Sequence, residues 1–191
     1  MKFIANTAIS LCTAVYTIFY MSLNDLTSNE GALSKTGLSH PVLFFIWGTL
    51  VYIALYKNIF SLAKTFGRIT SFHIIFAVSA LIGMGLTLFF KFDYSLKTQY
   101  FLHCAGSLIF SVCTGVAVFI TYLSGFKKNV FNAVLTMIIG VILLTDLILL
   151  IIFKQNALIE TVPVLFALIA MPVTLAYNQY RKKNKEFADA S

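Results

Sequence analysis

Residues 101–123 read FLHCAGSLIFSVCTGVAVFITYL, an apolar stretch that contains one histidine, His103. A helix rises about 1.5 Å per residue, so about 20 apolar residues cross the ~30 Å hydrocarbon core of a bilayer. At helical spacing, His103 shares one face with three hydroxyl side chains, Ser107, Ser111 and Thr114. Because polar groups are costly in lipid, we expect this face to point into a protein interior.

The composition of the whole chain indicates an integral membrane protein. Of its 191 residues 59% are hydrophobic and 11% are charged, whereas about a quarter of residues are charged in soluble domains. The net charge of +7 is explained by basic cytoplasmic loops, so we expect membrane lipid and no nucleic acid as a partner. The three cysteines lie inside apolar runs without a C-x-x-C pair, and we interpret them as packing residues.

Six apolar segments predict an all-α, polytopic membrane protein that forms a single domain. The polar segment 24–40 is the one long connection, and both a lid or binding segment and a disordered connector fit its length. A basic cytoplasmic tail is expected at residues 178–191. The predicted spanning helices lie at about residues 3–23, 41–63, 69–90, 99–123, 130–153 and 157–177.

The distribution of basic residues predicts the orientation in the membrane. With six spans both termini lie on one side, and cytoplasmic loops collect Lys and Arg. We therefore expect both termini in the cytoplasm and the protein in the cell (inner) membrane. The side of the termini would hold ten basic residues, namely Lys2, Lys57, Lys64, Arg68, Lys127, Lys128, Arg181, Lys182, Lys183 and Lys185, and the other side four, namely Lys35, Lys91, Lys97 and Lys154.

In this topology most of the polar and ionisable residues in or next to the apolar segments lie near the outer face. Asp146 lies in the run VILLTDLILLII at residues 141–152, about 10 Å below the outer end of its helix. Intramembrane ionisable residues mark functional sites more often than not. We therefore predict an outward-facing polar pocket whose ligand-binding candidates are His40, Trp47, Tyr16, Tyr20, His103, Asp146 and Glu160.

His103 and Asp146 are the two candidate catalytic residues. Each would leave a polar group unpaired at membrane depth, so we predict that they approach within a direct or one-water hydrogen bond. The pair could act as an acid–base or ligand-orienting unit, or it could pin the bundle as a structural bond. Whether the chain is an enzyme stays open, because P-loop, G-x-S-x-G and H-E-x-x-H motifs are absent.

We expect no metal site, and the sequence does not specify a cofactor. His73 would lie near the cytoplasmic face, about 20 Å or more from His40 and His103, which disfavours a three-histidine zinc site. A zinc or iron site made from His40, His103, Asp146 and Glu160 is the alternative on ligand type alone.

Residues 83–110 read GMGLTLFFKFDYSLKTQYFLHCAGSLIF and carry a family resemblance. The segment resembles the third-to-fourth-helix region of DRAM-like and related bacterial six-helix membrane families, with His103, Gly106 and Phe110 at the matching positions. This resemblance implies a six-helix bundle and no particular chemistry. The size, topology and long first outer loop are also similar to the substrate-binding subunits of energy-coupling-factor vitamin transporters.

These observations predict three alternative functions. The first is binding or transport of a small molecule or lipid through the outward-facing pocket, with segment 24–40 as its cover. The second is an intramembrane hydrolase or transferase that uses His103 and Asp146. The third is a structural subunit with a membrane-protein partner.

Overall fold

The computed structural model describes residues 2–153 and 156–190, and its helices confirm the predicted all-α class. No strand occurs in these two ranges. Six of the helices are long and apolar enough to cross a membrane. In chain order the elements are α1 (Lys2–Met21), η1 (Asn29–Gly31), α2 (Leu33–Ser39), α3 (Pro41–Phe66), α4 (Ser71–Phe89), α5 (Lys97–Gly125), η2 (Phe126–Lys128), α6 (Val130–Phe153) and α7 (Ala157–Ala190).

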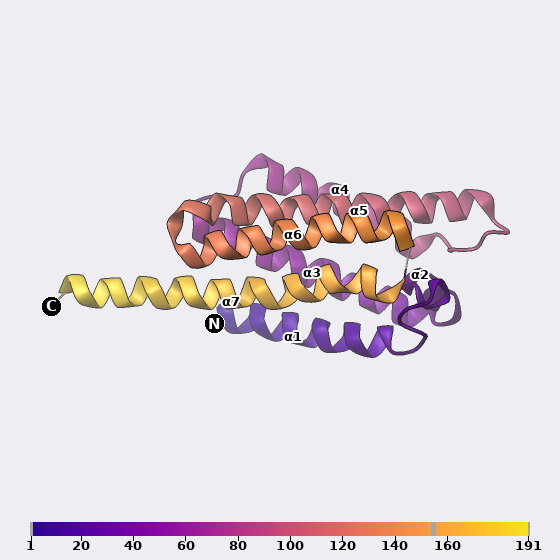
Figure 1. Ribbon diagram of the computed structural model, residues 1–191, viewed down its shortest axis with the longest axis horizontal. Helices are drawn as coiled ribbons and strands as arrows, with labels where there is room; N and C mark the ends of the chain where they lie inside the picture. Colours follow the sequence, from indigo (N-terminus) through magenta and orange to yellow (C-terminus); the bar gives the residue numbers. More distant parts are fainter. Residues whose placement is uncertain (1, 154–155, 191) are drawn as a thin grey trace.

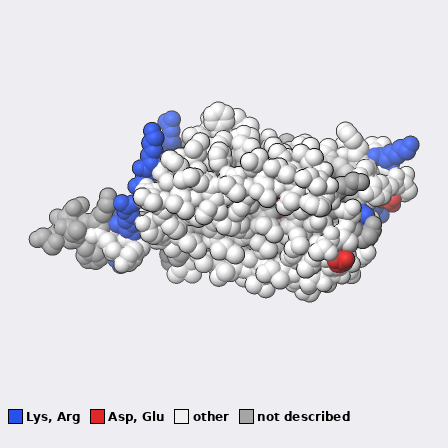
Figure 2. Space-filling view, in the orientation of Figure 1, with Lys and Arg blue, Asp and Glu red and all other residues white. Residues whose placement is uncertain are grey.

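The six long helices run alternately up and down, and both termini lie at the same end of the bundle (Figure 1). The short helix α2 lies at the opposite end, near the turn between α4 and α5. Charged side chains gather at the two ends, and the middle of the visible face is almost entirely uncharged (Figure 2). Such a band is expected where lipid tails surround a bundle.

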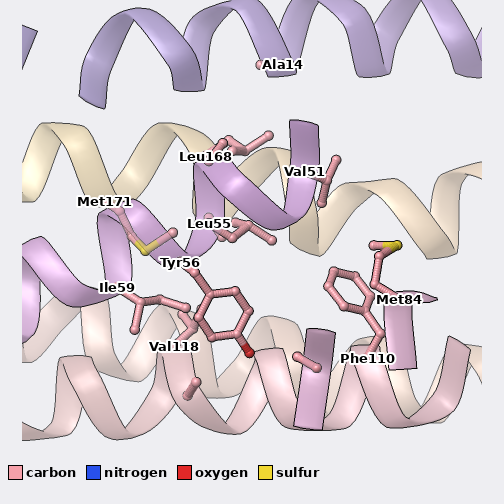
Figure 3. Packing of buried hydrophobic residues seen from close by; sticks show 14 of the residues in the cluster. Ala14, Val51, Leu55, Tyr56, Ile59, Met84, Phe110, Val118, Leu168 and Met171 are labelled. Atoms are coloured by element: carbon pink, nitrogen blue, oxygen red, sulfur yellow. The ribbon is translucent and has the colours of Figure 1, made fainter. Parts of the chain in front are cut away.

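Helix α3 is the centre of the bundle and packs against α1, α2, α4, α5 and α7. Its residues Val51, Leu55 and Ile59 are fully buried. Figure 3 shows them among side chains of the surrounding helices, including Leu168 of α7 and Val118 of α5. Burial of these side chains excludes lipid and water from the central seam, which fixes α3 as the scaffold for its neighbours.

Helices α4 and α5 make the most intimate contact, through a pair of glycines. A Cβ atom added to Gly83 would lie 2.7 Å from the carbonyl oxygen of Gly106 and 2.7 Å from the amide nitrogen of Phe110. A Cβ on Gly106 would lie 2.6 Å from the carbonyl oxygen of Gly83. Small residues allow two membrane helices to bring their backbones together, so this contact sets the position of His103 one turn away on α5.

The segment 24–40 is folded, which corrects its interpretation as a disordered connector. It contains η1 and α2, and Leu33, Ser34 and Thr36 of α2 are buried. Asn24 Nδ2 donates a hydrogen bond to Thr36 Oγ1 at 2.8 Å, and Tyr20 OH donates one to the Leu33 carbonyl at 3.1 Å. A seven-residue helix is marginal alone, so these tertiary contacts explain why α2 forms.

The basic end of the chain also differs from the prediction. The last predicted helix ends near residue 177, whereas α7 continues to Ala190 and carries the basic segment as an extension of the helix beyond the bundle (Figure 1). Lys182 Nζ lies 3.7 Å from Glu186 Oε1 in an i, i+4 pair on this extension. Such exposed pairs add only a few tenths of a kcal/mol each to helix stability.

Candidate functional site

A cavity of about 200 Å³ lies inside the bundle, in the half that holds α2. Its walls come from α3, α4, α5, α6 and α7, and α2 contributes Leu33 and Ser34. Most of the lining side chains are apolar, for example Leu55, Phe110 and Leu143. The polar groups that line it are Ser34, Thr87, Cys104, Ser107, Ser111, Thr114, Asp146 and Glu160.

The cavity exists because α6 packs tightly along only part of its length. Its buried residues are Asn132, Thr136 and Ile139, all near the end of the bundle that holds the termini. None of residues 140–153 is buried. Thr136 Oγ1 donates a hydrogen bond to the Tyr122 carbonyl at 3.1 Å, which fixes the first half of α6 against α5. The second half therefore leaves room for the cavity between itself, α5 and α7.

Glu160 occupies the first turn of α7, where the helix dipole favours a negative charge. Its Oε2 atom accepts a hydrogen bond at 2.8 Å from the backbone N–H of Leu33, the first residue of α2. The N-cap residue of α2, Ala32, has no side chain that could accept this bond. Glu160, which belongs to α7, therefore takes the place of the missing N-cap side chain of α2. The same bond holds α2 over the end of the cavity.

Asp146 is partly buried and lines the same cavity from the second half of α6. It makes no hydrogen bond or ion pair with the residues that the structure describes. Two acidic groups from different helices are therefore brought to one cavity.

The predicted bond between His103 and Asp146 is wrong. His103 is 2% exposed, and its Nδ1–H donates to the Phe90 carbonyl at 2.8 Å. Its Nε2 atom accepts a hydrogen bond at 2.8 Å from Ser34 Oγ, which comes from α2. Both ring nitrogens are thus occupied, so His103 supports the cavity wall through Ser34 and does not meet the carboxylate.

The aromatic candidates form a packed cluster beside the cavity. Trp47 lines the cavity and donates its Nε1–H to Thr17 Oγ1 at 3.2 Å. Tyr20 is buried, and its ring centroid lies 6.0 Å from that of Trp47 and 6.2 Å from that of Phe44. Tyr16 donates its hydroxyl to the Leu43 carbonyl at 3.2 Å. Tyr16 and Tyr20 therefore join α1 to its neighbours and do not line the cavity.

His40 is exposed at the junction of α2 and α3, away from the cavity lining. Within the described ranges, no three His, Cys, Asp or Glu side chains lie together in a way that could hold a metal ion. The alternative metal site of two histidines and two carboxylates is therefore not assembled, because His40 and His103 do not join Asp146 and Glu160. His73 is buried at the start of α4 and accepts a hydrogen bond from the Thr70 N–H at 3.2 Å in a capping box.

The structure also adds residues that sequence reasoning did not select. Ser34 and Thr87 line the cavity, and Cys104 does so although its predicted role was packing. Of the hydroxyl residues on the predicted inward face of α5, Thr114 is buried, and Ser107 and Ser111 also line the cavity although Ser111 is exposed. Ser34 has no comparable signal, since it enters the wall through the tertiary docking of α2.

No protein-family model, curated protein or solved structure matches this chain. The six long apolar helices define the class of protein, an all-helical integral membrane protein. The resemblance of residues 83–110 to DRAM-like families stays a prediction.

Proposed function

We propose that this integral membrane protein binds an amphiphilic small molecule or a lipid in the cavity among α3, α5, α6 and α7, from the outer side of the cell membrane. One observation carries the proposal, a cavity of about 200 Å³ with mostly apolar walls and two carboxylates. Ligand sites are typically concave, largely apolar and equipped with a few polar groups that orient the ligand.

The position of the polar groups supports an amphiphilic ligand. Glu160 is in the first turn of α7, and Asp146 lies seven residues before the end of α6, about 10 Å from it. Both groups therefore lie toward the α2 end of the cavity. The cavity wall toward the termini is apolar and includes Ile139 of α6 and Ala167 of α7. Each of these residues is seven positions from the carboxylate on its own helix, which corresponds to about 10 Å along the helix.

The hydrolase or transferase alternative receives less support from the geometry. A general base needs a free nitrogen or oxygen within hydrogen-bond reach of the substrate. Of the predicted catalytic pair, His103 uses both of its nitrogens within the protein, which leaves Asp146 without its predicted partner. The structural-subunit alternative predicts a bundle whose polar groups satisfy one another. Asp146, which has no hydrogen-bond partner among the described residues, favours ligand binding over that alternative.

Fluorescence of Trp47 tests the proposal, because Trp47 is the only tryptophan of the chain and it lines the cavity. Purified protein in lipid nanodiscs would be titrated with two brominated probes of equal chain length, an alkyl alcohol and an alkylamine. Bromine quenches tryptophan at contact, so we expect saturable quenching by at least one probe.

The matched control moves the tryptophan to the lipid-facing side of the same helix. The variant Trp47→Phe with Phe45→Trp places it at a position that is 45% exposed and outside the cavity. Quenching there should rise with the amount of probe in the bilayer without saturating. If Trp47 responds to both probes in the same unsaturable way as the control, the cavity does not bind a ligand and the proposal is wrong.

A further inference from the structure

We infer that the ligand of this cavity is a lipophilic cation, an apolar molecule that carries a protonated amine or a quaternary ammonium group. The inference rests on the proposed function and names the chemical class of its ligand. It follows from the charges, the aromatic groups and the polarity of the cavity.

The charges on the cavity wall are of one sign. Asp146 and Glu160 line the cavity, and no Lys, Arg or His from the described ranges does so. A carboxyl group away from bulk water stays ionised only with a cation or several hydrogen-bond donors, and otherwise takes up a proton. A ligand with a positive head group would satisfy this requirement for both side chains at once.

Neither carboxylate has all of its hydrogen-bond positions filled by the residues that the structure describes. Asp146 has no hydrogen-bond or ion-pair partner within the part of the chain that the structure describes. Glu160 uses Oε2 for the Leu33 N–H, while its Oε1 atom accepts no hydrogen bond from a described residue. Both groups line one cavity, and a cation bound between them would be attracted by each ionised carboxylate.

Aromatic rings line the same cavity as the carboxylates. Phe44 and Trp47 contribute to the wall, and their ring centroids are 5.8 Å apart in a stacked arrangement. Tryptophan and phenylalanine faces attract organic cations, and aromatic side chains are a common means of binding quaternary ammonium groups. A neutral amphiphile would lack the cation–π attraction to these rings, and an anionic one would be repelled by ionised carboxylates.

The apolar part of the ligand would extend away from the head group. Toward the termini the wall consists of side chains such as Val118, Ile139 and Ala167. A molecule with its ammonium group near Asp146 would place its alkyl or aryl part along this wall. The hydroxyls of Ser107 and Ser111 on α5 also line the cavity and can accept hydrogen bonds from a protonated amine.

A pair of probes that differ in one atom tests the inference. Octyltrimethylammonium and its neutral isostere, in which carbon replaces the nitrogen, would compete with the brominated probe for Trp47 in nanodiscs of zwitterionic lipid. We expect the cation to bind at least about tenfold more tightly than the isostere. Octanoate, an anion of similar chain length, should not compete.

Two variants show whether the preference depends on the cavity carboxylates. Asp146→Asn keeps the size of the side chain and breaks no hydrogen bond to a described residue, and it should lower the ratio of the two affinities severalfold. Asp93→Asn, which removes a carboxylate from the turn between α4 and α5, should leave the ratio unchanged.

The outcomes separate the inference from the proposed function. Saturable binding with equal affinity for the cation and its isostere would overturn the inference while ligand binding in the cavity stands. Saturable binding that prefers the cation equally in the Asp146→Asn variant would also overturn it. Absence of saturable quenching by any probe would overturn both. Should Asp146→Asn fail to fold, the ratio of the cation and isostere affinities is compared between the unmodified protein and Glu160→Gln. An unchanged ratio in Glu160→Gln would then overturn the inference.

Discussion

His103 shows at the scale of one residue how a buried imidazole joins three parts of the chain. Its Nδ1–H donates to the carbonyl of Phe90, the C-cap of α4, and its Nε2 accepts from Ser34 of α2. Phe44 and Phe92 pack around the ring, with centroids 6.0 Å and 5.2 Å away. Satisfied polar groups in a buried setting specify one arrangement of the helices that carry them.

We predict that His103→Leu destabilises the protein by about 2 kcal/mol, because Ser34 and the partly buried carbonyl of Phe90 lose their hydrogen bonds. Ser34→Ala removes only one of these bonds and should cost less. Adding Ser34→Ala to His103→Leu should cost almost nothing more, since the bond is already lost. Reversible unfolding in detergent measures all three variants, and an unchanged stability of His103→Leu would contradict the assigned bonds.

Asp93 gives a prediction for pH. Its Oδ1 atom accepts hydrogen bonds from Ser95 Oγ at 2.7 Å and from Ser95 N–H at 2.9 Å. The Ser95 side chain, then its backbone N–H, holds the pKa of Asp93 below its ordinary value. The turn is therefore stabilised above the ordinary aspartate pKa, and this stabilisation is lost as the pH falls through the lowered pKa.

Carboxyl NMR of Asp93 measures this shift directly. Ser95→Ala removes the side-chain donor and should move the pKa of Asp93 back toward its ordinary value. Asp25 offers an internal control, since its lowered pKa depends first on the backbone N–H of Thr27 and should not respond to Ser95→Ala. An unchanged Asp93 titration in Ser95→Ala would show that the hydroxyl does not hold the carboxylate.

At the scale of the elements, two helix pairs have contrasting contacts. In the first pair, the backbones of α4 and α5 touch at Gly83 and Gly106. In the second pair, α5 and α6, the second half of α6 has no buried residue. The first pair fixes the position of His103 and thereby of α2. The second creates the cavity, because one wall is held at only one of its ends.

A pair of substitutions on α4 tests the close contact. Gly83→Ala forces the two backbones apart, and we expect a loss of about 1–3 kcal/mol. Gly85→Ala, two residues away, has no atom within 4 Å of the new Cβ and should be neutral or stabilise the helix by about 0.5–1 kcal/mol. Equal stabilities of the two variants would contradict the packing of α4 against α5.

At the scale of the whole molecule, the six spans could be predicted because each one is encoded locally. Long apolar runs and loops with basic residues specify length and position, and the helix bounds differ from the predicted ones mainly at α7. The partners of His103 could not be predicted. Sequence spacing gives the depth of a residue but not the rotation of its helix, and it cannot identify a backbone carbonyl such as that of Phe90 as an acceptor.

The fold of α2 shows the same limit. Its seven residues have no strong periodic pattern, and the helix depends on Tyr20, Asn24 and Glu160, which come from outside it. Asp146 and Glu160 were correctly placed near one end by counting residues from the predicted helix ends. That they line one cavity, and that His40 does not, depends on how the helices pack.

The orientation of the bundle gives a prediction for intact cells. Lys35→Cys in α2 should react with a membrane-impermeant thiol reagent added outside, and Lys183→Cys in α7 should react only after permeabilisation, because basic residues favour the cytoplasmic side. Replacing the three native cysteines by serine provides the background. External labelling of position 183 but not of position 35 would reverse the orientation.

The central claim is that the cavity holds an amphiphilic ligand, and mass spectrometry of molecules that copurify with the protein tests it most directly. Ser107→Phe should fill much of the cavity that Ser107 lines, whereas Val112→Phe adds the same ring at a position on the same helix that is 53% exposed and outside the lining. We predict a stoichiometric small molecule or lipid with the unmodified protein and with Val112→Phe, and its loss from Ser107→Phe. Equal retention by both variants, or no retained molecule with the unmodified protein, would contradict the claim.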